Sequence, residues 1–137
     1  MFNVLIIARP GVLRESLSAL LATMPEINVV SATNDLDSAY EFVSRLQPTI
    51  CIMNFSNQGD DKEQKINQLK SILPEMKTIV LVDTVEAKEM AETHGFNKVV
   101  IKGSSVQQLT KTISDCIQES MADLEKSKQK SNKNLND

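Results

Sequence analysis

The sequence predicts one α/β domain in which a five-stranded parallel sheet is covered by helices on both faces. Short apolar runs, rich in β-branched residues, recur five times along the chain, and each is followed by apolar residues at helical spacing. The connections are too short for anything but strand–helix–strand units, whose crossovers are right-handed. At 137 residues the chain is long enough to bury a proper core. The pattern is therefore that of a doubly wound sheet.

The first half of the chain contains two strand–helix units. Predicted strands cover Val4–Ile7 and Ile27–Val30, and Pro25 ends the first helix. Asn34 is predicted to cap the second helix, and Pro48 closes its unit. The two helices are indicated by apolar stripes at Leu13, Leu17, Leu20, Leu21 and Met24, and at Leu36, Ala39, Tyr40, Val43 and Leu46.

The central strand is predicted at Thr49–Asn54. An apolar run without polar alternation is typical of a strand that is buried on both faces of a parallel sheet. In open α/β sheets, ligands and chemistry lie just beyond the carboxyl ends of the central strands. Asn54 therefore occupies a position where a functional residue is expected, and it has an amide there in place of a carboxylate.

The second half of the chain repeats the pattern. Strands are predicted at Thr78–Val82 and Lys98–Ile101, and a weaker helix between them, Val85–His94, has Gly95 at its C-terminal cap. Ser105 is predicted to open the last helix through a capping box. The third and last helices are indicated by stripes at Ile66, Leu69, Ile72 and Leu73, and at Val106, Leu109, Ile113, Cys116, Ile117, Met121 and Leu124.

The composition is that of an ordinary globular protein. A net charge of −3 gives no reason to expect a nucleic-acid surface. Cys51 and Cys116 fall on predicted core positions, and with the single His94 they have no metal-site spacing. No cofactor is predicted. Because no signal peptide and no apolar run of membrane-spanning length are found, we expect a cytoplasmic protein.

Six short stretches form a recognisable series by their order and spacing: Val4–Ile7, Val12–Leu17, Ile27–Val30, Gln47-Pro48, Gly95-Phe96 and Ile101–Ser105. Through them, about residues 3–120 resemble the receiver domain of bacterial response regulators, which has the CheY-like, flavodoxin-like fold. The chain looks most similar to the NarL/LuxR-type branch of that family. The resemblance implies the strand order 2-1-3-4-5.

The resemblance also implies where the phosphate chemistry of the family would lie. An acidic pair after the first strand holds Mg²⁺ in receiver domains, and an aspartate at the end of the third strand accepts the phosphoryl group. The matching positions here are Ala8, Arg9 and Asn54. An amide is not a carboxylate nucleophile, Ala8 offers Mg²⁺ no ligand, and Arg9 would repel the ion. We therefore predict no metal and no phosphorylation at this site.

The remaining positions of the family's site are partly changed. Val82 stands where a Thr or Ser would end the fourth strand, and Val99 stands where an aromatic switch residue is found in the fifth. Val82 cannot donate a hydrogen bond to a phosphoryl oxygen. Lys102, after the fifth strand, is retained. We therefore predict a pseudo-receiver, which is no enzyme but a phosphorylation-independent module for signalling or transcription regulation.

An alternative function is a sensor of anions or small ligands. In that hypothesis, Arg9 and Lys102 both border the former phosphate pocket and hold the ligand. Against it, Lys102 can hydrogen-bond the amide of Asn54, and Arg9 can lie in solvent or pair with a nearby acid. The candidate acids are Asp60, Asp61 and Asp83. Phosphate acceptance by one of these acids is the least favoured hypothesis.

The partners of the protein are predicted from its last helices. We divide the chain into a receiver-like domain, 1–120, and an extension of the last helix followed by a polar linker or disordered tail, 121–137. Met121 and Leu124 continue the apolar stripe, so packing at the domain edge and a role in a dimer both stay open. We expect a protein partner or a homodimer, DNA only if a helix-turn-helix exists outside this chain, and no membrane.

Overall fold

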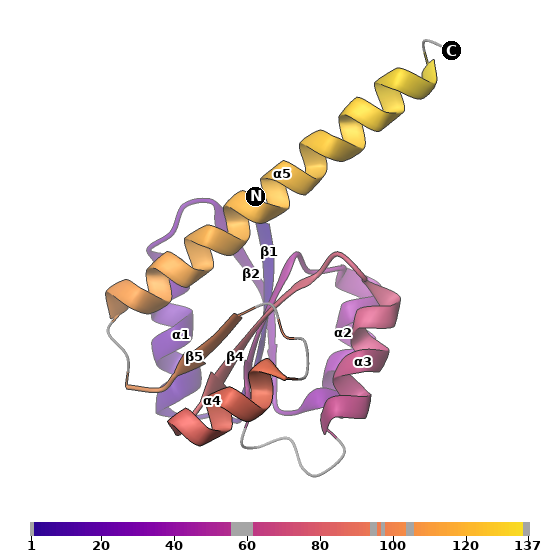
Figure 1. Ribbon diagram of the computed structural model, residues 1–137. Coiled ribbons are helices and arrows are strands. Elements are labelled where there is room, and N and C mark those ends of the chain that lie inside the picture. The colour runs from indigo at the N-terminus through magenta and orange to yellow at the C-terminus, as the bar shows by residue number, and fades with distance from the viewer. Residues whose placement is uncertain (1, 56–61, 94–95, 97, 104–105, 136–137) are drawn as a thin grey trace.

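The computed structural model describes residues 2–55, 62–93, 96, 98–103 and 106–135 (Figure 1). Five parallel strands form a single sheet in the order β2-β1-β3-β4-β5, with helices on both sides. The predicted fold class and strand order are confirmed. The strands are β1 Phe2–Ile7, β2 Ile27–Thr33, β3 Ile50–Asn54, β4 Lys77–Val82 and β5 Lys98–Ile101.

The helices divide into two layers, one on each face of the sheet. Side chains of α1 and α5 pack in one hydrophobic cluster, and side chains of α2, α3 and α4 pack in the other. No described helix is both long enough and apolar enough to cross a membrane. The helices are α1 Val12–Ala22, α2 Leu36–Leu46, α3 Lys62–Ile72, α4 Val85–Glu92 and α5 Val106–Leu135.

Every residue of β3 is buried, as the uninterrupted apolar run predicts. Because successive side chains of a strand point to opposite faces, Ile50 and Ile52 pack in the α1–α5 cluster while Cys51 and Met53 pack in the other. The neighbouring strands obey the same alternation in matching register, with Ile6 paired to Ile52 and Ile52 to Ile79. The sheet is thus the shared core of both layers.

The caps of two helices are supplied by side chains at their N-termini. Asp35, and not the predicted Asn34, caps α2: its carboxylate accepts a hydrogen bond of 2.8 Å from the amide of Ser38. Both residue types are good caps, and the extended backbone at Asp35 decides between them. Thr84 caps α4 through a bond of 3.0 Å from the amide of Ala87.

The last helix is held to the sheet by two ion pairs. Lys77, at the start of β4, lies 2.9 Å from Asp123, and Lys98, at the start of β5, lies 3.1 Å from Glu119. The helix then continues to Leu135, past the point where the apolar stripe stops. Residues 125–135 contain no Gly or Pro and several strong helix formers, which accounts for a helical backbone there. The boundary at residue 120 stays a prediction.

Several predicted features lie outside the described residues. These are the capping box at Ser105, the cap at Gly95, His94, and the acids Asp60 and Asp61.

The two cysteines predict an alkaline loss of stability. Burial raises the pKa of the Cys51 thiol to about 12 and that of Cys116 to about 11, from an ordinary value of 9.0. Above pH 9 the unfolded thiols lose their protons while the folded ones keep theirs, so the unfolded state gains stability. We expect the free energy of unfolding to fall by about 1 kcal/mol per thiol between pH 8 and pH 10. Urea unfolding at both pH values measures this, and the Cys51→Ala/Cys116→Ala variant should show a smaller fall.

Candidate functional site

The carboxyl ends of four strands meet at one edge of the sheet. The register pairs Ile7 of β1 with Met53 of β3, Asn54 of β3 with Leu81 of β4, and Val82 of β4 with Ile101 of β5. The residues that end or directly follow these strands therefore lie side by side. This edge brings together the predicted site positions Ala8, Asn54, Val82 and Lys102.

Asn54 ends β3 and is only 6 % exposed. By the alternation along the strand, its side chain lies on the α1–α5 face, as do those of Ile50 and Ile52. Ala8 belongs to the same cluster, and its amide donates a hydrogen bond of 2.9 Å to the carbonyl oxygen of Thr33. The two positions thus share one face of adjacent strands, with a methyl group beside an amide.

Arg9 follows Ala8 and is exposed. The hydrogen bonds that Ser38 donates to the Asp35 carboxylate, at the start of α2, lower the pKa of that group, and the charges of Lys65 and Arg9 make smaller contributions. Arg9 is therefore an exposed cation with only a small electrostatic effect on Asp35.

The two predicted switch positions are aliphatic residues that pack into the sheet core. Val82 is buried in the cluster formed by α2, α3 and α4, and Val99 packs against that same cluster. Their side chains therefore lie on the face opposite to Asn54. The switch roles assigned to these positions stay predictions.

The residue beside Lys102 is Asp83, the first residue after β4. The Lys102 ammonium lies 3.0 Å from an Asp83 carboxylate oxygen, and the Lys102 amide donates a bond of 2.7 Å to the Val82 carbonyl. Leu81 and Val100 pack on the α1–α5 face, so Asp83 and Lys102, two residues further along their strands, share a face with Asn54.

The sequence predicts Asp83 only as a possible partner for Arg9. Its position directly after an apolar run was the signal that it belongs to this edge.

A small cavity of about 200 Å³ opens between α1, β5 and α5 next to this edge. Lys102 contributes to its wall, but the other lining residues are mainly apolar, and Arg9 and Asn54 are not among them. The cavity thus does not join the two cations of the sensor hypothesis. Among the described residues, no group of three or more His, Cys, Asp or Glu side chains is placed to hold a metal ion.

The chain is similar in sequence to parts of two curated regulators. It is 25 % identical over 113 residues to the response regulator protein VraR of Staphylococcus saprophyticus, which covers 81 % of this chain and 54 % of that protein. It is 23 % identical over 115 residues to the transcriptional regulatory protein LnrK of Bacillus subtilis, covering 82 % and 52 %. The chain therefore spans about half the length of these relatives. The sequence matches no family model.

Solved structures with a similar fold are more numerous than relatives with a similar sequence. The signal receiver domain of the putative response regulator NarL from Mycobacterium tuberculosis superposes with a TM-score of 0.72 at 20 % identity, covering 84 % of this chain and 94 % of that one. The receiver domain of AraT from Geobacillus stearothermophilus gives 0.77 at 17 % identity, covering 90 % and 98 %. This is the fold of a response-regulator receiver domain.

A LuxR-family response regulator from Staphylococcus aureus shares the receiver fold as well, with a TM-score of 0.72, 16 % identity, and coverage of 85 % of this chain and 98 % of that one. NarL- and LuxR-type proteins are thus among the neighbours of this receiver fold, as the sequence predicts. Within the receiver fold, the edge described above is the carboxyl end of the sheet, where open α/β folds place their ligands.

The Lys102–Asp83 pair predicts a measurable coupling in stability. The Lys102 side chain is only 25 % exposed, so its charge is poorly solvated without the carboxylate. We expect a double-mutant cycle of Lys102→Met and Asp83→Asn, read by urea unfolding, to give a coupling of about 0.5–1 kcal/mol. The exposed pair Lys88–Glu92, 3.9 Å apart on α4, serves as the control and should couple more weakly. Equal coupling in both cycles would contradict the prediction.

Proposed function

We propose that this chain is a receiver-type regulatory module that works without phosphoryl transfer at position 54. The observation that carries the proposal is the amide of Asn54 at the end of β3, buried at the carboxyl edge of the sheet. Formation of an acyl phosphate needs a carboxylate oxygen as nucleophile. An amide has no such oxygen, so the chemistry typical of the family has no acceptor here.

The residues after β1 support the same proposal. Mg²⁺ prefers hard, usually anionic oxygen ligands in a near-octahedral arrangement. Ala8 offers a buried methyl group, and Arg9 adds a positive charge where the ion would need negative ones. At an effective dielectric constant of ~20, a unit charge ~4 Å from another contributes about 4 kcal/mol, and more for a divalent ion. The side chains present do not fit the ion.

The charge of Lys102 gives further support. Because Asn54 is neutral, it cannot supply the counter-charge that an aspartate would supply at the same place. The carboxylate of Asp83 supplies it instead, at 3.0 Å from the ammonium. The charge of Lys102 is therefore compensated within the protein before any phosphoryl group arrives.

We propose protein interaction as the output of this module. VraR and LnrK are named as a response regulator and a transcriptional regulatory protein, and by analogy we assign this chain to transcription regulation. DNA contact would need a helix-turn-helix outside this chain. The last helix offers a surface for a partner or a second copy, since Met121 and Leu124 are 51 % and 57 % exposed.

The absence of phosphoryl transfer can be tested by mass spectrometry. After incubation with acetyl phosphate and Mg²⁺, we expect the intact mass to stay unchanged, whereas one phosphoryl group would add about 80 Da. The Asn54→Asp variant should also stay unmodified, because restoring the nucleophile does not restore the metal ligands. A receiver domain with an intact acidic pair, treated in parallel, verifies the reagents. A gain of mass in the unaltered chain would refute the proposal.

The homodimer can be tested by sedimentation over a range of protein concentrations. A charge at Met121 should oppose burial of this surface, so Met121→Glu is expected to raise the dissociation constant by on the order of tenfold. Gln107→Glu, also exposed on α5 but near its other end, introduces the same charge far from Met121 and serves as the control. A strict monomer at all concentrations would rule the homodimer out.

A further inference from the structure

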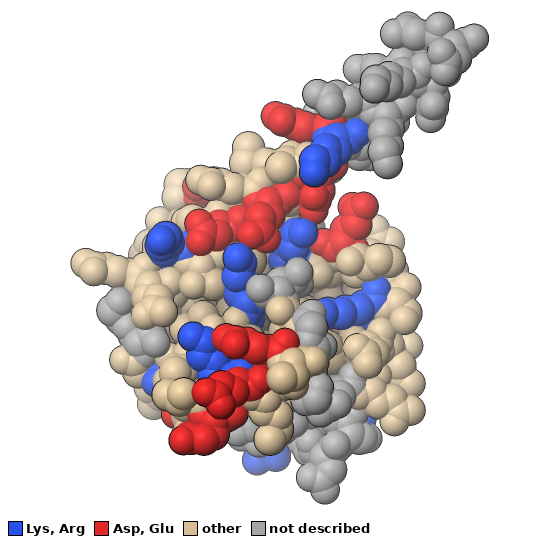
Figure 2. Space-filling view, in the orientation of Figure 1, with Lys and Arg blue, Asp and Glu red and all other residues tan. Residues whose placement is uncertain are grey.

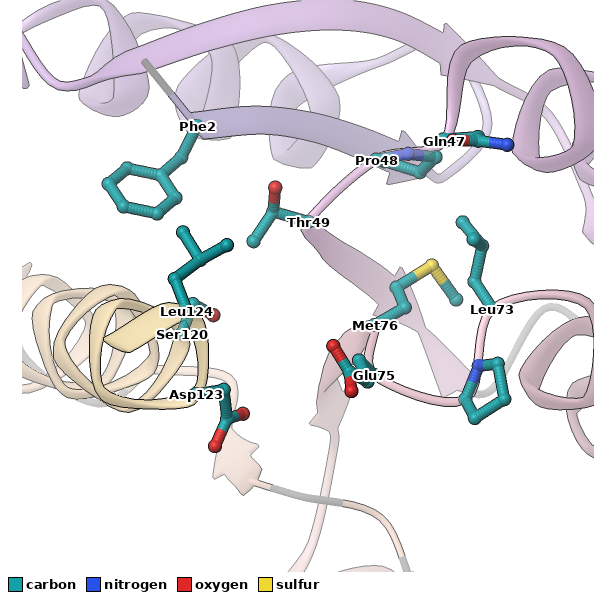
Figure 3. A pocket seen from close by; sticks show the side chains of 11 residues that line it. Phe2, Gln47, Pro48, Thr49, Leu73, Glu75, Met76, Ser120, Asp123 and Leu124 are labelled. Atoms are coloured by element: carbon teal, nitrogen blue, oxygen red, sulfur yellow. The ribbon is translucent and has the colours of Figure 1, made fainter. Parts of the chain in front are cut away.

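A larger cavity lies at the other end of the sheet, between the amino-terminal ends of the strands and α5 (Figure 3). Its volume is about 620 Å³, within the range of small-molecule sites. We propose that this cavity binds a small amphipathic amine, with its apolar part against the wall formed by the strand ends and its ammonium group near Glu75. The proposal does not depend on the chemistry at position 54.

The buried hydroxyl of Ser120 on α5 is the first observation that points to a ligand. Ser120 lines the cavity and is 6 % exposed, yet its oxygen has no hydrogen-bond partner among the described residues. Hydroxyls elsewhere on α5 do find partners: Thr110 and Thr112 donate to the carbonyls four residues earlier, at 2.7 and 2.9 Å. A buried hydroxyl without a partner is unfavourable, and the ammonium group of the ligand would satisfy it by donating a hydrogen bond to its oxygen.

The walls of the cavity are the second observation. Figure 3 shows Phe2 and Leu124 on one side and Leu73 and Met76 on the other, with Thr49 between them. Four large apolar side chains around one cavity favour an aliphatic or aromatic body in the ligand, because burying that body removes apolar surface from water.

The charged residues beside the cavity determine which sign of charge the ligand should have. Two carboxylates line it, Glu75 from the turn before β4 and Asp123 from α5 (Figure 3). Asp123 is neutralised by Lys77 at 2.9 Å, whereas Glu75 forms no ion pair with any described residue. The rim therefore has an uncompensated negative charge, which favours a cation over a neutral or anionic head group.

The site also joins the sheet to the last helix. Ser120, Asp123 and Leu124 all lie on α5, while Phe2, Thr49 and Met76 come from strands and the turns before them. A ligand between these two groups would stabilise the packing of α5 on the sheet, since it contacts both.

Three probes with the same chain and different head groups test the proposal by titration calorimetry of the full chain. We expect 1-octylamine to bind saturably at one site, with a dissociation constant of about millimolar or tighter. 1-Octanol should bind more weakly, and octanoate most weakly. No saturable binding of the amine would overturn the site, and equal binding of the three probes would overturn the assignment to a cation.

Two variants test whether the amine binds in this cavity. Ser120→Ala should weaken octylamine binding by about threefold or more while leaving the thermal midpoint of the free protein unchanged or higher, because an unpartnered hydroxyl is removed. Glu75→Gln, at an exposed position, should weaken it by about two- to fivefold. The controls Ser44→Ala and Glu86→Gln, both exposed and outside the cavity, should leave it unchanged. Unaltered affinity in either cavity variant would overturn the proposal.

Discussion

Burial of the central parallel sheet on both faces is the constraint on which the rest of the molecule depends. Each residue of β3 is buried, and its side chains alternate between the α1–α5 layer and the layer of α2, α3 and α4. With both faces covered, the ends of the strands are the places where the sheet meets solvent. Open α/β folds place their ligands at the carboxyl edge of the sheet, and the amino edge is the opposite end of the same strands.

These two edges differ in how far their polar groups are satisfied. At the carboxyl edge, the buried side chains of Ala8 and Asn54 lie on one face, and the Lys102 ammonium is compensated by the Asp83 carboxylate at 3.0 Å. At the amino edge, and among the described residues, the buried hydroxyl of Ser120 has no hydrogen-bond partner and the carboxylate of Glu75 forms no ion pair. Figure 2 shows acidic side chains along α5 with basic side chains beside them. Two of the acids of α5, Asp123 and Glu119, form ion pairs with Lys77 and Lys98.

Most of the architecture could be predicted because it follows from the period of the apolar residues. The strand Lys98–Ile101 was predicted with its observed bounds, and β3 and β4 to within one residue. Helix ends were less predictable. Adjacent Asn34 and Asp35 are both good caps, and only the backbone conformation selects Asp35. The apolar stripe also does not specify where α5 ends: the helix continues to Leu135, past the last apolar residue of the stripe, since a helix can continue on intrinsic propensity alone.

The sequence by itself determined the fold class and the identity of the groups at the carboxyl edge, because residue type alone says that Ala8 and Asn54 have no carboxylate. Only the tertiary structure decided which polar groups at the ends of the sheet lie next to each other. Asp83 and Lys102 are far apart in the chain and meet because β4 and β5 are adjacent and in register. Ser120 lines the same cavity as Phe2 and Thr49 because α5 packs across the sheet, and no local pattern in the chain specifies which residues that packing brings together.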